Sequence, residues 1–153
     1  MRIFLGLALL LAGCGDPGRA ERQFIGDLYS DAAKSFRGAD LLPERSAPPL
    51  AAWLRLQATL ARLPALAARC TPERDYLWDA PPATIHYGYP ADIRWAAGRV
   101  QVWDRLAFAV SCRGPRCRLD DIFLARPDGW TSLAQHIGRR CPGPPSLFPT
   151  EKP

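Results

Sequence analysis

The sequence has few of the features that mark an enzyme. It contains no Gly-x-Ser-x-Gly nucleophile elbow, no His-Glu-x-x-His zinc helix and no glycine-rich phosphate loop. Histidine is scarce too, because His86 and His136 are the whole complement and lie far apart in the sequence. Each is explained more simply as a surface or hydrogen-bonded core histidine than as a general base. We therefore predict no catalytic residues, no cofactor and no metal site.

Lysine is nearly absent, since only Lys34 and Lys152 occur, and arginine carries almost all of the positive charge. The chain has 20 basic and 15 acidic residues, a net charge of +5. The basic residues form no run, which argues against nucleic acid as a partner. A mild positive charge is compatible with anionic lipid headgroups or an acidic partner. The preference for arginine fits either a GC-rich genome or carboxylate recognition at an interface.

Long hydrophobic runs are missing as well. The run at residues 3–12 follows Arg2 and is too short to span a bilayer, but its length suits an export signal. It ends in Leu11-Ala12-Gly13-Cys14, which resembles the lipobox of bacterial lipoproteins. The resemblance implies cleavage after Gly13, a diacylglycerol on the thiol of Cys14 and acylation, for example by palmitate, of the new amino terminus. The alternative is an ordinary secretory signal with an incidental cysteine.

The lipobox resemblance divides the chain into four parts. Residues 1–13 are expected to be the signal peptide, 14–19 a lipidated tether, 20–141 a single domain and 142–153 a proline-rich, extended or disordered tail. Asp16 is not adjacent to Cys14, the position where an aspartate commonly marks inner-membrane retention. The expected location is therefore the bacterial envelope, anchored by lipid to the periplasmic face of the outer membrane.

Four cysteines remain once Cys14 is acylated. An even number of cysteines in an exported domain predicts two disulfides, for which three pairings are possible. Cys112 and Cys117 flank a four-residue turn, so they are expected to pair, which leaves Cys70 with Cys141. A four-thiolate zinc site is the rival, although the spacing has no Cys-x-x-Cys pair.

The order of the predicted elements indicates an α+β fold. Apolar residues at three- and four-residue steps predict helices over about 20–37 and from 46–49 to 64. The segment 72–78 is expected to be a weak helix or turn. Strands are expected at 84–89, 93–95, 100–112 and 117–126, and a short helix or last strand at 130–137. The expected architecture is two N-terminal helices packed on a curved antiparallel sheet and stapled by two disulfides.

The stretch Leu119-Asp120-Asp121-Ile122, followed by the turn at 128–133, is similar to the closing strand and turn of the nuclear transport factor two-like superfamily. The resemblance implies a cone-like roll with helices in the concave side of the sheet. It also implies a pocket in which some members use an aspartate or a histidine for catalysis. Asp120 and Asp121 are adjacent on a strand, so their side chains face opposite ways and cannot form a carboxylate pair.

Aromatic residues are dense between positions 76 and 103 and alternate there with charged residues. Tyrosine, tryptophan and arginine are the residue types that anchor protein interfaces. We expect the exposed members of this set to bind a partner, the others being core: Tyr76, Trp78, Tyr87, Tyr89, Arg94, Trp95 and Trp103.

These observations together favour a lipid-anchored periplasmic binding domain without catalysis. Small lipoproteins of this build include immunity proteins, which inhibit an antibacterial effector secreted by a neighbouring cell. Two alternatives remain open: a cone-fold domain that binds or transforms a small hydrophobic molecule, and an accessory lipoprotein of an envelope complex.

Overall fold

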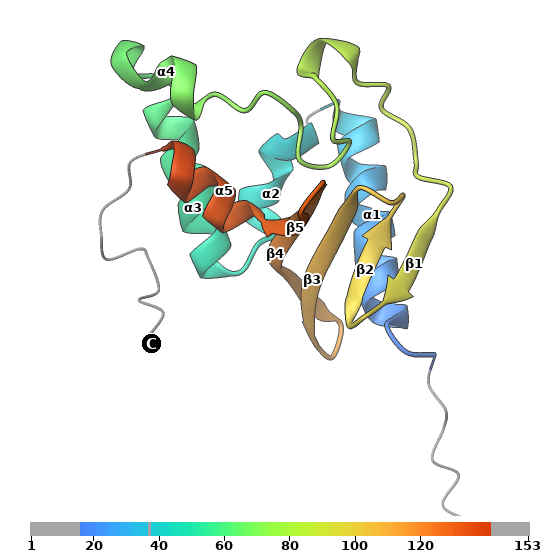
Figure 1. The fold of residues 1–153 in the computed structure, drawn as a ribbon. Coiled ribbons are helices and arrows are strands. Elements are labelled where there is room, and N and C mark those ends of the chain that lie inside the picture. The colour runs from blue at the N-terminus through green and yellow to red at the C-terminus, as the bar shows by residue number, and fades with distance from the viewer. Residues whose placement is uncertain (1–15, 37, 142–153) are drawn as a thin grey trace, which may run out of the picture.

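The computed structural model describes residues 16–36 and 38–141 (Figure 1). The predicted signal peptide, Cys14 and the proline-rich tail lie outside the described residues. The helical segments are α1 (Arg19–Ser35), η1 (Gly38–Leu41), α2 (Leu42–Arg45), α3 (Pro48–Leu60), α4 (Pro64–Cys70), η2 (Pro82–Thr84) and α5 (Leu133–Arg140). The strands are β1 (Ile93–Ala96), β2 (Arg99–Val102), β3 (Leu106–Arg113), β4 (Arg116–Arg126) and β5 (Gly129–Ser132).

The five strands form one antiparallel sheet in the order β1-β2-β3-β4-β5, so each strand pairs with its neighbours in sequence. Tight turns that contain glycine connect several of them, and Gly98, Gly114 and Gly129 all have positive φ. The pairing of β3 with β4 contains a bulge: Ala109 pairs with Asp121 and Val110 with Leu119. Asp120 is therefore left over between them, which is the defining feature of a β-bulge.

Helix α1 lies against the sheet because its apolar residues recur on one side. Ile25, Leu28, Tyr29 and Ala32 are all fully buried, and their spacing of three and four residues places them on one stripe. The helix ends at Ser35, and the N–H of Phe36 closes it by donating to the Ala32 carbonyl. The predicted end at Gly38 is therefore close to the observed one.

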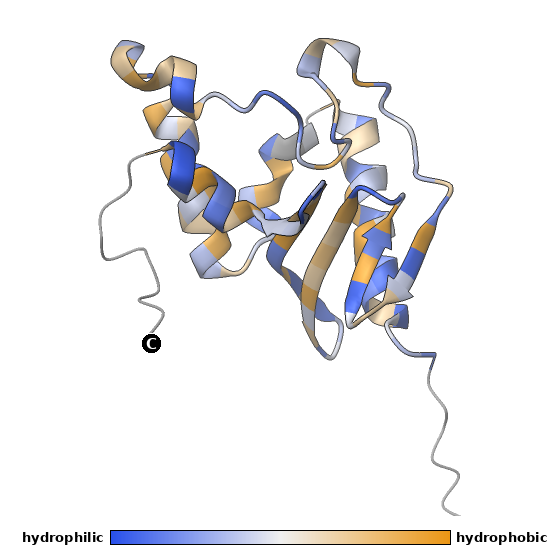
Figure 2. Ribbon diagram, in the orientation of Figure 1, coloured by the Kyte–Doolittle hydropathy of each residue, from blue (hydrophilic) through white to orange (hydrophobic). Residues whose placement is uncertain are grey.

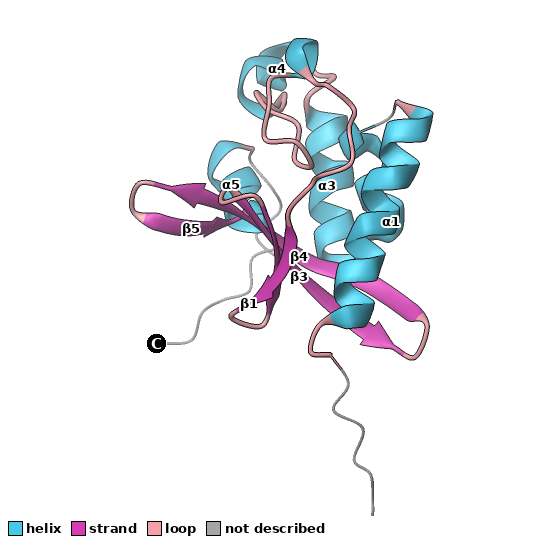
Figure 3. Ribbon diagram, turned by 90° about the vertical axis from the view of Figure 1, so that its right-hand side faces the viewer, coloured by secondary structure: helices cyan, strands magenta, loops and turns pink. Residues whose placement is uncertain are grey.

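Helices α1 and α3 lie on the same side of the sheet (Figure 3). Apolar residues on both helices and on the strands they cover form one core, visible as orange segments in Figure 2. A parallel bridge between Ser46 and Leu119 joins the helical half to the sheet, and the N–H of Ala47 donates to the Leu119 carbonyl at 2.7 Å.

The phenol of Tyr29 is the centre of this core. Its ring makes edge contacts with Trp78, Trp103 and Phe108, at centroid distances of 5.4, 6.0 and 6.3 Å. Its hydroxyl donates to the carbonyl of Leu77, which ties α1 to the loop after α4. Burial is the main reason that the pKa of Tyr29 lies well above its usual value.

Two glycines let the chain between η2 and β2 pack closely on α1. The ring of Trp95 lies where a side chain on Gly18 would stand, and Gly18 has a φ of 72°. The hydroxyl of Tyr89 similarly occupies the space next to Gly26. Both residues therefore cover the outside of α1 rather than extend away from it.

The mixed α+β class and the antiparallel sheet are confirmed, but several predicted details are not. Besides α1 and α3, the N-terminal half contains η1, α2 and α4, so it is not two helices. The predicted strand at 84–89 is wrong: this segment is irregular, and it is bounded by prolines at 81, 82 and 90, which have no N–H to donate to a ladder. The segment 130–137 holds the end of a strand, β5, and then a helix, α5.

The cysteines are only partly placed as predicted. The sulfur atoms of Cys112 and Cys117 lie at disulfide-bonding distance, with Cα atoms 4.0 Å apart. Cys70, the last residue of α4, and Cys141, just after α5, are buried free thiols, so the second predicted disulfide is not formed. The two thiols nevertheless meet, because a hydrogen bond joins Cys141 to Cys70.

Candidate functional site

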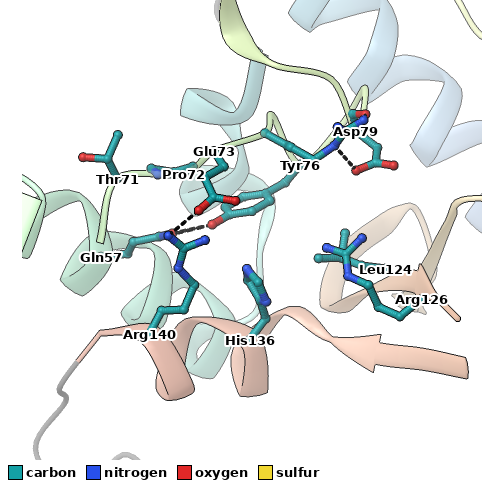
Figure 4. Close-up of a pocket in the computed structure, with 11 residues that line it drawn as sticks. Gln57, Thr71, Pro72, Glu73, Tyr76, Asp79, Leu124, Arg126, His136 and Arg140 are labelled. Carbon is teal, nitrogen blue, oxygen red and sulfur yellow. Dashed lines mark hydrogen bonds and ion pairs between the residues drawn. The ribbon is translucent and has the colours of Figure 1, made fainter. Parts of the chain in front are cut away.

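A small cavity of about 40 Å³ lies between the loop after α4 and the helix α5 (Figure 4). A cavity needs roughly 10 to 15 Å³ to hold one water, so this one has room for only a few waters or a small ion. Its lining is polar and comes from α3, the loop, β4 and α5: Gln57, Thr71, Pro72, Glu73, Arg74, Tyr76, Asp79, Leu124, Arg126, His136 and Arg140.

Most of the polar groups around the cavity are paired with one another. The Gln57 amide nitrogen donates to the Tyr76 hydroxyl at 2.7 Å, and burial raises the pKa of Tyr76 to about 12. Arg140 forms an ion pair of 2.8 Å with Glu73, and this hydrogen bond holds the pKa of the Glu73 carboxyl below its usual value. These contacts attach the loop to α3 and α5.

A second ion pair, between Arg74 Nε and Asp79 Oδ1 at 2.8 Å, lies within the loop and holds it in a turn. Asp79 has a φ of 46°, a left-handed conformation that aspartate tolerates better than most side chains. Ion pairs thus hold the loop both at Glu73 and at Asp79.

His136 faces the cavity from α5 beside Arg126 (Figure 4). Partial burial, followed by the charges of Arg126 and Arg140, lowers the pKa of His136. The imidazole is therefore neutral at pH 7. Both carboxylates that line the cavity are engaged by arginines, Glu73 by Arg140 and Asp79 by Arg74, so the cavity does not present a carboxylate–histidine pair for proton transfer.

The other candidate acid–base residues lie apart from this cavity. His86 is exposed in the irregular segment after η2. Asp120, the bulge residue, is exposed and accepts a hydrogen bond from Ser111 at 3.0 Å. Asp121 is half-buried and accepts one from Ser132 at 2.5 Å, next to the start of α5. The structure does not bring these three residues together, and each aspartate has a local structural partner.

The residues predicted to bind a partner divide into core and surface. The prediction that Tyr76 and Trp78 bind a partner is wrong, because both side chains are buried in the core. Trp103 is half-buried against Tyr29, and Trp95 is half-buried on Gly18. The guanidinium of Arg94 is exposed but engaged by Asp92 at 3.3 Å and Asp104 at 2.5 Å.

Two exposed aromatic side chains and a half-buried one lie along α1: Phe36 is at its C-terminal end with Tyr87, and Tyr89 lies beside Gly26 and the first turns of the helix. Phe36 is 71% exposed, Tyr89 is 63% exposed, and the half-buried Tyr87 lies between Phe36 and the core. The rings of Phe36 and Tyr87 make an edge contact at 5.5 Å, and Tyr87 contacts Trp78 at 5.1 Å. We call Phe36, Tyr87 and Tyr89 the aromatic surface.

Sequence reasoning missed Phe36, which fits the apolar stripe of α1 by its spacing. The structure turns it out of the stripe because its backbone has a φ of 52°, a left-handed conformation. Such a conformation is costly for a residue with a bulky side chain and is usually occupied by glycine. The nearby Gly38 was the available signal that the helix ends here and that its last aromatic residue need not face the core.

Two further features describe the protein within residues 16–36 and 38–141. No group of three His, Cys, Asp or Glu side chains is arranged to hold a metal ion there. None of the helices in this part of the chain combines the length and apolar character needed to cross a membrane.

The chain matches no known family model, and no curated protein or solved structure shows significant similarity to it.

Proposed function

We propose that this protein is a lipid-anchored envelope protein that binds a protein partner through its aromatic surface, as an immunity-type lipoprotein binds and inhibits a secreted antibacterial effector. The observation that carries the proposal is the exposure of two large aromatic side chains along α1, Phe36 at its C-terminal end and Tyr89 beside Gly26. Exposed aromatic side chains are typical of binding surfaces.

The backbone strain at Phe36 is a second argument that this surface has a binding role. A left-handed phenylalanine costs of order 1 kcal/mol or more relative to glycine, and such strain is often kept where a side chain has a function. The cavity beside His136 supports a small-molecule function less well, because about 40 Å³ is far below the roughly 300 Å³ of a typical ligand pocket.

The anchor is tested by Cys14→Ser. Acylation requires the thiol, so the variant is expected to lose labelling by a clickable palmitate analogue completely and to accumulate as uncleaved precursor. Gel fluorescence and the mass of the N-terminal peptide measure both effects. Cys112→Ser is the matched control and should keep its label. A Cys14→Ser chain that is still labelled would show that the anchor is not at Cys14.

Partner binding is tested by Phe36→Gly. Glycine suits the left-handed backbone at this position, so the variant is expected to fold with an unchanged or higher Tm while losing the aromatic ring. If Phe36 is a central contact, its loss weakens binding by about 2 kcal/mol or more, which is at least tenfold in Kd. The measurement is affinity capture of the acylated chain from envelope and secreted fractions, followed by Kd determination for the captured protein.

Two variants make this experiment decisive. Tyr89→Ala should weaken the same partner, and Trp130→Ala, which removes an exposed aromatic residue from β5, should leave the Kd unchanged. Equal Kd values for Phe36→Gly, Tyr89→Ala and the unmodified chain would remove the aromatic surface as the binding site. Recovery of a co-purified small molecule that the chain transforms would instead favour the ligand-binding alternative.

A further inference from the structure

The β3–β4 turn carries three arginines on a rigid tip. Arg113, Arg116 and Arg118 are exposed, and the Cys112–Cys117 pair holds the two strands together at this point. We call residues 112–118 the arginine hairpin. Among the described residues, none of its three arginines forms an ion pair. Arg118 donates only to the backbone carbonyls of Glu44 and Ser46, at 3.2 and 3.3 Å.

The charge around the arginine hairpin is not the same on its two sides. Towards α3, a groove is lined by all three arginines with Ala47, Pro48 and Ser111, and none of these described lining residues is acidic. Towards α1, Asp27 and Glu44 join Arg45 in the lining, so the charge there is nearly balanced. The lining is therefore more positive on the α3 side, where, among the described residues, the one carboxylate in reach is Asp120, which accepts a hydrogen bond from the lining residue Ser111.

The arginine hairpin lies at the end of the molecule where the described chain begins. Ala20 and Gln23 of the first turns of α1 line the same groove as Gly114 and Arg116. Figures 1 and 3 both show the start of α1 at the same end as the β3–β4 turn. Cys14 precedes Asp16 by two residues, and two extended residues span at most about 7 Å.

We infer that the arginine hairpin docks on the anionic phospholipid headgroups of the membrane that carries the anchor; this rests on the proposed acylation of Cys14. An anchor at Cys14 holds the first turn of α1, and with it the hairpin, close to the bilayer. Charges within about 8 to 10 Å of the headgroups escape most of the screening by physiological salt. Guanidinium groups match lipid phosphates through paired hydrogen bonds. The short tether favours the membrane over an acidic protein as the occupant.

Docking fixes the orientation of the domain on the membrane. With the hairpin and the start of α1 against the headgroups, Phe36, at the other end of α1, faces away from the bilayer. Phe36 and its neighbour Tyr87 are then presented to a partner that arrives from the periplasm, whereas Tyr89 lies nearer the membrane, beside Arg19 and Arg22. The arginine hairpin thus places the proposed binding surface as well as holding the domain.

The test is hydrogen–deuterium exchange of the acylated full chain in two kinds of vesicle. One is phosphatidylcholine alone and the other contains about one-third phosphatidylglycerol. One arginine close to an anionic surface is worth roughly a fivefold change in occupancy. The amides of residues 113, 114 and 116–118 are therefore expected to exchange at least fivefold more slowly in the anionic vesicles, and high salt should abolish the difference.

Two double variants with the same change in charge test the hairpin. Arg113→Glu with Arg116→Glu should remove the protection of the hairpin amides. Arg62→Glu with Arg69→Glu changes exposed residues near α4, at the far end of the molecule, and should keep that protection. Circular dichroism confirms folding of both. The mass of the N-terminal peptide reports acylation independently of docking.

Each remaining outcome has a definite meaning. If the chain is acylated but the hairpin amides exchange equally in both kinds of vesicle, the docking proposal is overturned and the lipid anchor at Cys14 stands. A Cys14 without lipid would overturn both proposals. Protection by a soluble acidic polypeptide such as polyglutamate, without protection by anionic vesicles, would reassign the arginine hairpin to an acidic protein.

Discussion

Oxidation of Cys70 and Cys141 to a disulfide is expected to raise the free energy of unfolding by about 4 kcal/mol. The two buried thiols meet between α4 and the end of α5, and a bond between them closes a loop of about 70 residues. Restricting the unfolded chain by a loop of this length is the source of the effect. The reaction removes one proton and one electron from each thiol, so an oxidant such as oxidised glutathione must accept the pair of electrons.

The oxidation is expected to occur before the domain is fully folded. Burial, followed by the hydrogen bond to Cys70, raises the pKa of the Cys141 thiol to about 12. The thiolate is the reactive form, so very little of it is present in the folded protein at pH 7. Refolding in glutathione buffer should therefore give the disulfide much faster than treatment of the folded, reduced chain.

The measurement is urea unfolding with and without reductant, in a Cys112→Ser and Cys117→Ser background that isolates the second pair. Adding Cys70→Ala and Cys141→Ala provides the control, which should show no dependence on reductant. Peptide mapping identifies the bond. If mapping shows the Cys70–Cys141 bond, equal stability with and without reductant would contradict the prediction. Free thiols that persist after oxidative refolding would contradict it directly.

Replacing Tyr29 by alanine is expected to remove a large part of the free energy of unfolding. Tyr29 is fully buried and contacts three aromatic rings, so its removal leaves a cavity in the centre of the core. Deletion of a buried aromatic side chain costs about 3 to 5 kcal/mol, against a total stability of roughly 5 to 15 kcal/mol for a domain. The free energy of unfolding in urea measures the loss.

Tyr29→Phe separates the hydroxyl from the ring. It keeps the aromatic contacts but leaves the buried Leu77 carbonyl without its donor, at a cost of about 1 to 2 kcal/mol. Tyr87→Ala is the control on the rim of the same aromatic cluster, where partial exposure predicts a smaller loss. A Tyr29→Ala variant no less stable than Tyr87→Ala would show that the centre of the core lies elsewhere.

The parts of the fold that follow from short-range patterns were predictable from the sequence. The stripe from Ile25 to Ala32 defines α1, and the turns at Gly98, Gly114 and Gly129 separate the strands of the meander. The segment 84–89 was wrongly predicted to be a strand because its β-branched and aromatic residues suit one. Its Tyr89 instead covers Gly26 of α1, a long-range contact that local propensity does not contain.

The candidate site was less predictable, because exposure depends on the whole fold. Tyr76, Trp78 and Tyr89 look alike in sequence, yet the first two are core and the third covers the outside of α1. Phe36 reaches the surface only through its left-handed backbone. The polar cavity joins α3, a loop, β4 and α5, which have no common signature in the sequence.

The meander topology also bears on how fast the domain folds. Each strand finds its neighbour across a short turn, so the sheet assembles without closing any long loop. The contacts that do close long loops attach helices to the rest: Tyr29 to Leu77, 48 residues apart, and Ser46 to Arg118, 72 residues apart. We therefore expect docking of the helical half onto the sheet to be the step that sets the folding rate.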